Sequence, residues 1–185
     1  MSKKFKPAQI LEAFGEKVGN ELLSGHTVSS KDVIKSFLQQ RFFSNVNEGL
    51  AQVIQHHDVP IRFEMHEDGI FAKAIFDKDG GSYISIDPSV IPTLSNRYVA
   101  DVILHEMIHS LTVSAINNPV GKIQKDFAKQ NNRLYEIFDK LFPASTYNRL
   151  DLNNPYYALL DKYEFASVFI TDKRVRDLFY QEAIR

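Results

Sequence analysis

The sequence predicts a single α+β domain. Residues 58–90 contain three short runs of β-branched and aromatic residues separated by turn residues, which is the pattern of a small sheet. Segments with the apolar spacing of helices lie before them, from residue 8 to 57, and after them, from residue 95 to 183. The 185 residues contain no internal repeat and no linker, and one domain can hold this length. Helices, then strands, then helices is the order of an α+β fold.

The N-terminal segment, residues 1–57, is expected to be helical. Helices are predicted over 8–24 and 30–57. In the second of these, apolar residues such as Val33, Phe37 and Leu50 recur near helical spacing, and the stretch "VSSKD" offers serine caps before it. The remaining residues, 58–185, form the expected core of the domain.

Three strands are predicted in the middle of the chain. They correspond to "VPIRFEMH", "IFAKAIFD" and "SYISIDPS", and "DKDGG" between the last two is a hairpin turn. Short strands of this kind favour a small, mostly antiparallel sheet. After the sheet, "ASTYNRLDLNNPYY" resembles a loop, and Pro143 ends the helix before it. Helices are predicted here over 95–116, 121–142, 157–171 and 173–183.

The composition excludes several classes of function. With no cysteine, the chain has no disulfide, no cysteine zinc site and no thiol nucleophile. The net charge is −1, and the six lysines among residues 1–36 are offset by four acidic residues, so we expect no nucleic-acid partner. We find neither an uninterrupted signal-peptide core nor a run of transmembrane length. We therefore expect an intracellular, cytoplasmic protein without a membrane partner, which leaves delivery by another route open.

The stretch "DVILHEMIHSLT", residues 101–112, contains the H-E-x-x-H pattern of zinc peptidases. On a helix His105 and His109 lie about 40° apart, one turn from each other, so both imidazoles can reach one cation. Glu106 lies roughly 60° from His109, beside the metal, where it can accept a proton from water that zinc acidifies. The alternative interpretation is an ordinary core helix whose histidines bind backbone carbonyls.

A catalytic zinc site needs a third protein ligand. Thr112 and Ala115 occupy the positions where metzincins have glycine and histidine, and no histidine follows His109, so a later carboxylate is expected. Glu164 stands out because "YALLDKYEFASVFI" surrounds it with apolar residues, where a carboxylate needs a partner. The other candidates are Asp126, Glu136, Asp139, Asp151, Asp161 and Glu182.

The segment "YALLDKYEFASVFITD" resembles the downstream motif of gluzincin-type zinc metallopeptidases, in which Tyr-Ala-Leu precedes Glu-Phe. Similar sequences occur in peptidase-like domains of phage and mobile-element proteins. The same tyrosine-to-glutamate spacing occurs in the catalytic domain of anthrax lethal factor and in Pro-Pro endopeptidases. The resemblance covers residues 80–178. Two positions depart from the pattern: Val168 replaces an acidic residue that is frequent there, and lysine stands at 162 and 173 where many relatives have proline.

The resemblance implies a zincin-like fold with an active-site helix and C-terminal helices, and a metalloendopeptidase that acts on peptide or protein substrates. It implies His105, His109 and Glu164 as ligands of Zn2+ and Glu106 as the general base. Tyr157 would stabilise the oxyanion. Tyr157 precedes Glu164 by seven residues, about two helical turns, so both can face one side, although Tyr157 can equally be a packing aromatic.

Two further expectations concern substrate binding and the remaining histidines. "SYISIDPS" is expected to be an edge strand, either one that binds an extended peptide by β-augmentation or a purely structural one. His26, His56, His57 and His66 are expected not to bind metal. Two other functions compete with this one: a zincin-fold binding or structural module without turnover, and a nucleic-acid-associated regulator, for which the charges of residues 1–36 give no convincing footprint.

Overall fold

The computed structural model describes residues 6–78, 81–150 and 154–184. The chain has the predicted α+β class, with eight α-helices and one four-stranded mixed sheet in the described residues. It divides into two compact units, Met1–Ser110 and Leu111–Arg185. The boundary lies inside the long helix α5, Asn96–Asn117, which contributes residues to both units.

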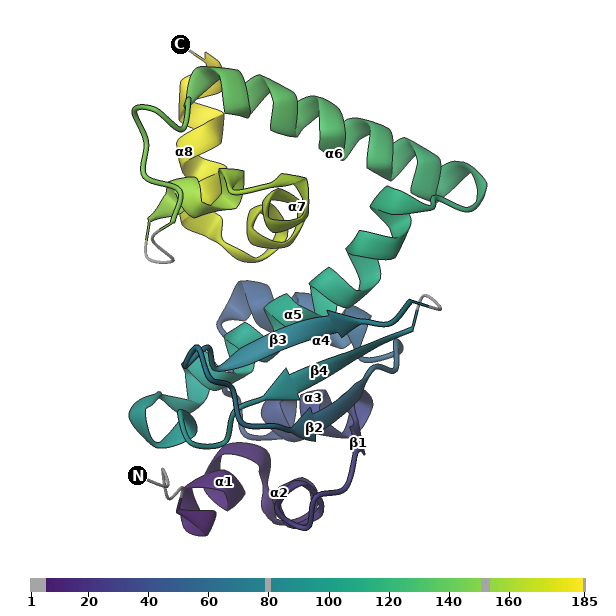
Figure 1. Ribbon diagram of the computed structural model, residues 1–185, viewed down its shortest axis with the longest axis vertical. Coiled ribbons are helices and arrows are strands. Elements are labelled where there is room, and N and C mark those ends of the chain that lie inside the picture. Colours follow the sequence, from purple (N-terminus) through teal and green to yellow (C-terminus); the bar gives the residue numbers. More distant parts are fainter. Residues whose placement is uncertain (1–5, 79–80, 151–153, 185) are drawn as a thin grey trace. The chain divides into compact units, whose positions relative to one another are not determined.

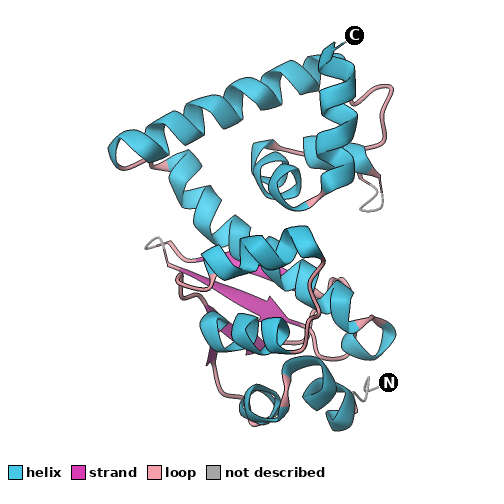
Figure 2. Cartoon of the chain, turned by 180° about the vertical axis from the view of Figure 1, so that it is seen from behind, coloured by secondary structure: helices cyan, strands magenta, loops and turns pink. Residues whose placement is uncertain are grey.

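The first unit contains the sheet and the N-terminal helices (Figure 1). Helices α3 and α4 and the first part of α5 cover one face of the sheet, as Figure 2 shows from behind. The elements before α5 are α1 Pro7–Phe14, α2 Glu16–Leu23, β1 Val28–Ser29, α3 Ser30–Gln39, α4 Asn45–Ile54, β2 Pro60–Phe63, β3 Ala72–Phe76, β4 Ser82–Ile86 and the short 3-10 helix η1 Ile91–Thr93.

The sheet has the strand order β1-β2-β4-β3. The pairs β1–β2 and β3–β4 are antiparallel, whereas β2 and β4 run parallel, so the sheet is mixed and, as expected, mostly antiparallel. The three predicted strands are all present. The two-residue β1 was not predicted, because its residues Val28 and Ser29 lie in the stretch that was interpreted as a helix cap.

The expectation that "SYISIDPS" forms an edge strand is wrong. This segment is β4, which lies between β2 and β3, and β3 is the edge strand on that side. The strand is central because it pairs with β2 along one edge and with β3 along the other. Ile84, Ser85 and Ile86 are all nearly inaccessible to solvent, and since successive residues point to opposite faces, this part of the strand is covered on both faces.

The segment 30–57, predicted as one helix, contains two. Ser29 caps α3 through a hydrogen bond that its Oγ accepts from the Lys31 amide, and Ser44 caps α4 in the same way through the Asn47 amide. Between the helices Arg41 has a positive φ of 56°, which is incompatible with a continuing helix. The serine cap was therefore predicted correctly, and the break was not.

The N-terminal helices share one core with the strands. The ring of Phe14 in α1 lies 5.6 Å from that of Phe37 in α3 and 5.8 Å from that of Phe63 in β2. In addition, the Ser36 hydroxyl donates a hydrogen bond of 2.8 Å to the Phe14 carbonyl. Residues before 58 thus belong to the same compact unit as the sheet.

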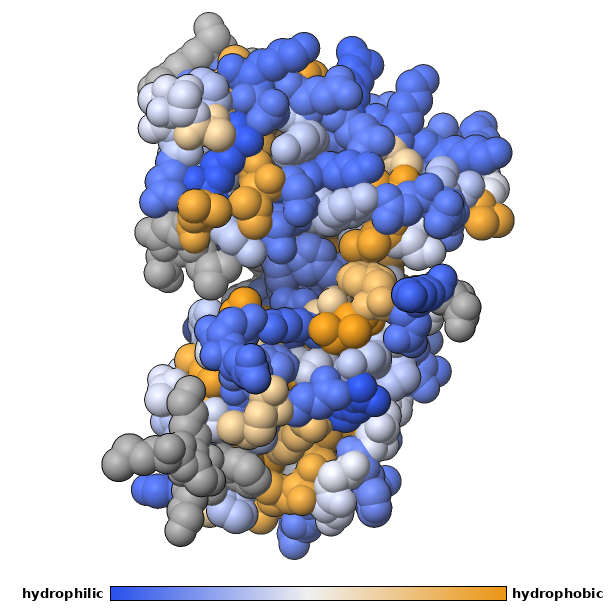
Figure 3. Space-filling model, viewed as in Figure 1, coloured by the Kyte–Doolittle hydropathy of each residue, from blue (hydrophilic) through white to orange (hydrophobic). Residues whose placement is uncertain are grey.

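The opposite face of the sheet, which is toward the viewer in Figures 1 and 3, carries hydrophilic as well as hydrophobic residues.

The second unit is helical. After the end of α5 it contains α6 Gly121–Leu141, the 3-10 helix η2 Pro155–Leu159, α7 Lys162–Thr171 and α8 Lys173–Ile184. Its core is aromatic: Phe138 of α6 and Phe165 of α7 pack with Phe179 of α8, and the rings of Phe138 and Phe179 are 4.3 Å apart. The buried Arg149 donates to the carboxylate of Asp139 and to the carbonyl of Leu159, which holds the connection before η2 against α6.

Helix α5 is the one described helix that is long and apolar enough to cross a membrane. More than half of the relevant window, 56%, is buried inside the protein. Burial of this kind is what a core helix of a soluble protein requires.

Candidate metal centre

Helix α5 positions the two histidines of the H-E-x-x-H pattern. Ile103, Leu104 and Met107 are completely buried and anchor the helix in the core of the first unit. His109 is 8% exposed and His105 is partly exposed. Their ring centroids lie 4.6 Å apart at an interplanar angle of 83°. The two imidazoles therefore stand side by side on one face, as the helical spacing predicted.

Glu106 is held by the backbone of the edge strand. Its Oε2 accepts a hydrogen bond of 2.7 Å from the amide of Ala74, in the middle of β3. The carboxylate that the sequence assigns to proton transfer is thus directed toward the edge of the sheet. No side-chain pattern could have predicted this contact, because the donor is a main-chain N–H.

The direction of the Ala74 amide follows from the β3–β4 ladder. The Asp77 amide donates to Gly81 and the Asp87 amide donates to Phe71, each at 2.8 Å, so odd-numbered residues of β3 bond to β4. In an antiparallel pair the alternate residues direct their N–H and C=O groups away from the partner strand. The even-numbered residues Ala72, Ala74 and Phe76 therefore present their backbone groups at the outer edge of the sheet.

Glu164 lies in the first turn of α7, in the second unit. Asp161 is the N-cap of this helix, and its Oδ1 accepts hydrogen bonds from the amides of Tyr163 at 2.7 Å and Glu164 at 2.9 Å. A carboxylate in the first turn is stabilised by the helix dipole. The next residue, Phe165, is 1% exposed and packs in the aromatic core. Glu164 therefore lies between the capped start of the helix and a residue that is fixed in the core.

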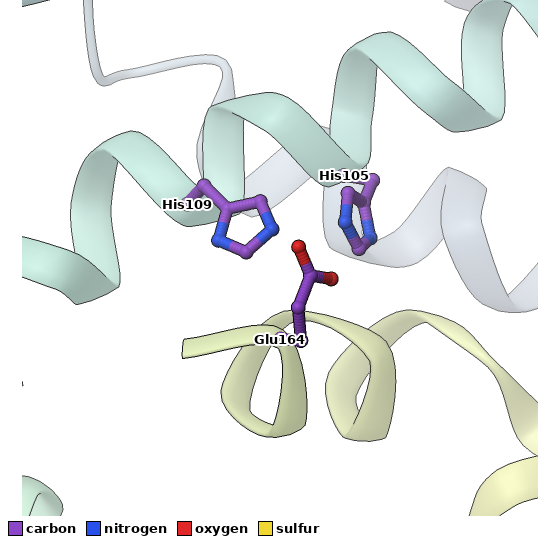
Figure 4. Close-up of side chains that lie close together, drawn as sticks. All are labelled: His105, His109 and Glu164. Atoms are coloured by element: carbon purple, nitrogen blue, oxygen red, sulfur yellow. The ribbon is translucent and has the colours of Figure 1, made fainter. Parts of the chain in front are cut away.

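Figure 4 shows His105 and His109 of α5 with Glu164 of α7. One potential ligand atom from each of the three lies within 4.8 Å of the other two. No second group of three such residues occurs in the described part of the chain. Two ring nitrogens and a carboxylate oxygen form a donor set that zinc accepts, and three protein ligands leave a position open for chemistry.

The other carboxylate candidates have different surroundings. Asp161 caps α7, and Asp139 forms a 2.7 Å ion pair with Arg149. Asp126 and Glu136 lie at exposed positions of α6, and Asp151 lies outside the described residues. The cluster of Figure 4 includes none of them.

Tyr157 is not on the same helix as Glu164. The predicted helix 157–171 is interrupted: Tyr157 belongs to the 3-10 helix η2, and α7 begins at Lys162. The interruption arises because Asp161 takes an extended conformation to cap α7. Tyr157 and Glu164 are therefore not related by two turns of one helix, and the proposed role of Tyr157 rests on the resemblance. Its neighbour Tyr156 packs against the rings of Phe142 and Tyr147.

Among the residues that the structure describes, the other four histidines do not belong to the group of His105, His109 and Glu164. The ring of His26 contacts the Glu21 carboxylate, and His56 and His57 are exposed beyond the end of α4. The ring of His66 contacts the Ile70 carbonyl and the Ser85 hydroxyl, so it has a structural role that the sequence did not indicate.

Comparison of the chain with models of known protein families, with curated proteins and with solved structures gives no match.

Proposed function

We propose that the protein is a zinc-dependent metallopeptidase of the gluzincin type with a zincin-like fold. The observation that carries the proposal is the group of His105, His109 and Glu164, whose ligand atoms lie within 4.8 Å of one another. A helix with both histidines and a separate helix with the glutamate are the two parts that the H-E-x-x-H interpretation requires. Zinc at this position would supply Lewis acidity toward a substrate carbonyl and would acidify water.

Glu106 is the general base in this proposal. It follows His105 on α5 directly, so it lies beside the ligands rather than among them. The hydrogen bond from the Ala74 amide fixes Oε2 of Glu106. The carboxylate is therefore oriented both by the helix that carries it and by the edge strand. A base that is already oriented contributes more to proton transfer than one that must be ordered during the reaction.

We propose that the substrate is an extended peptide that pairs with β3. Strand β3 is at the edge of the sheet, and the backbone groups of Ala72, Ala74 and Phe76 point outward from it. A peptide added to such an edge gains main-chain hydrogen bonds on either side of the Ala74 amide, which already donates to Glu106. Because Glu106 contacts the middle of this strand, a bound peptide would pass beside the base. Tyr157 is the proposed donor to the oxyanion, as the resemblance implies.

Terminal-peptide mass spectrometry of a proteome treated with zinc-loaded protein tests this function. Wild-type protein should generate new peptide termini, and Glu106→Gln protein, whose amide fills the same space but accepts no proton, should not. Zinc-loaded wild-type protein that produces no new termini would instead identify a zincin-fold module that binds without turnover. Equal cleavage by both proteins would remove Glu106 from the mechanism.

A further inference from the structure

The residue before Glu164 forms a hydrogen bond to the last residue of α5. The Tyr163 hydroxyl donates to Oδ1 of Asn117 at 2.5 Å, across 46 positions of sequence. Tyr163 is partly buried and Asn117 is exposed. This bond connects the first turn of α7 with the C-terminal end of the same helix that carries His105 and His109 nearer its middle.

The first turn of α7 is held from other directions as well. Asn131 of α6 is 6% exposed, and its Nδ2 donates 3.0 Å to the carbonyl of Lys162. Asp161 caps the amides of the same turn. These bonds fix where α7 begins and its position along its own axis. They do not fix the rotation of α7 about that axis, which depends on side-chain contacts.

The rotation of α7 is set by the two neighbours of Glu164. On a helix, Tyr163 and Phe165 lie about 200° apart with Glu164 between them. Phe165 is anchored in the aromatic core, with its ring 5.2 Å from that of Phe169. Tyr163 is anchored on Asn117. With both neighbours anchored on nearly opposite sides, the helix face between them, which carries Glu164, is presented in one direction.

We propose that Tyr163 and Asn117 are positioning residues that present Glu164 as the third metal ligand. The inference rests on the proposed function, since it assigns a role at the same site. An exposed hydrogen bond contributes little to global stability. Loss of the Tyr163–Asn117 bond should therefore lower mainly the metal affinity. Residues that orient metal ligands from outside the coordination sphere have this effect when they are mutated.

Zinc affinity, measured by competition with a chelating indicator, tests the proposal. Tyr163→Phe removes only the hydroxyl, and Asn117→Leu removes only its acceptor. Each should weaken zinc binding about tenfold, the lower end of the range for such residues, while the melting temperature changes little. The double variant should be no weaker than either single variant, because both remove one bond. Asn117→Asp retains an acceptor and should restore wild-type affinity.

A Glu164→Gln background separates this inference from the proposed function. If the bond acts through Glu164, Tyr163→Phe should have no further effect on zinc affinity in that background. Zinc binding that depends on Glu164 but is unchanged by Tyr163→Phe overturns the positioning role alone. An equal loss of affinity with and without Glu164 overturns it too. Wild-type protein that binds no zinc overturns the proposed function and the positioning role together.

Discussion

Glu106 Oε2 and the amide of Ala74 are joined by a hydrogen bond of 2.7 Å. This bond connects the H-E-x-x-H helix with the edge strand, two elements that are separated by more than 30 positions of sequence. It makes the strand a structural partner of the proposed base as well as the proposed docking site for a peptide. Because the donor belongs to the backbone, only a change to proline removes it.

Ala74→Pro should therefore lower kcat. The Ala74 amide is directed away from β4, so proline there breaks no ladder bond, and edge positions of this kind tolerate proline. Without the N–H the carboxylate is no longer fixed, and a misplaced catalytic group costs about 10²-fold in rate. Steady-state kinetics on a cleaved peptide, together with melting temperatures, measure this effect.

Phe76→Pro is the matched control, because the Phe76 amide also points outward but lies two residues from the amide that donates to Glu106. This variant should raise KM and leave kcat near the wild-type value. A kcat for Ala74→Pro equal to that of wild type, in a folded protein, would show that the bond has no catalytic consequence.

Glu164→Ala should lower zinc affinity severely. It removes one of the three residues of the proposed metal centre, whereas Glu136→Ala removes an exposed carboxylate of α6 that is outside it. Asp161 requires a different control, since alanine would also remove the cap of α7, a loss of about 0.5–2 kcal/mol of stability. Asp161→Ser keeps a capping oxygen and should keep zinc. If the Asp161→Ser protein lost zinc and the Glu164→Ala protein retained it, the assignment of Glu164 as the third ligand would be wrong.

Tyr157→Phe should retain zinc and fold but lose about 10²–10³ in kcat, the usual effect of removing one oxyanion donor. Tyr156→Phe should change little, because its ring packs against Phe142 and Tyr147 and phenylalanine preserves that packing. Single-turnover and steady-state rates of both variants measure the difference. The reverse ranking would transfer the role to Tyr156, and wild-type rates in both would make Tyr157 a packing residue.

The H-E-x-x-H helix could be predicted from sequence because it depends on local information, whereas the grouping of Glu164 with the histidines was implied by the family resemblance. His105 and His109 need only helical spacing, and Glu164 is recognisable as a carboxylate among apolar residues. The helix over 121–142 was likewise predicted nearly to its ends, since apolar periodicity continues until Pro143. The zincin-like fold and the role of each residue remain predictions.

The sheet topology and the helix breaks could not be predicted because they depend on partners distant in sequence. Nothing in "SYISIDPS" indicates that β2 pairs with it in parallel and makes it central. The break before α7 depends on the backbone conformation of Asp161, which is extended so that it can cap the helix. The contact between Glu106 and Ala74 involves a main-chain amide, which every residue except proline possesses.

Asp87 provides a prediction for acid stability. It is fully buried directly after β4. Burial alone would raise the pKa of its carboxyl, but hydrogen bonds from Ser89 and from the His66 amide lower the pKa below the ordinary 3.8. A folded pKa below the unfolded one stabilises the protein above about pH 4, and this stability is lost as the pH falls through the folded pKa.

Asp87→Asn should therefore reduce the free energy of unfolding at pH 7 by about 1–3 kcal/mol, since one of the two partly buried donors loses its acceptor. The difference between variant and wild type should become smaller as the pH is lowered below about 4. Urea unfolding at pH 7 and at pH 3 measures it. A difference of the same size at both values would show that the charge of Asp87 contributes nothing.

The zinc content of the purified protein tests the central claim most directly. Elemental analysis should find about one zinc per chain in wild-type protein, because two histidines and a carboxylate form a standard catalytic ligand set. The same analysis should find about one zinc in Glu106→Gln protein and none in His105→Ala or His109→Ala protein. Stoichiometric zinc in His105→Ala protein, or none in wild-type protein supplied with zinc, would contradict the metal centre formed by His105, His109 and Glu164.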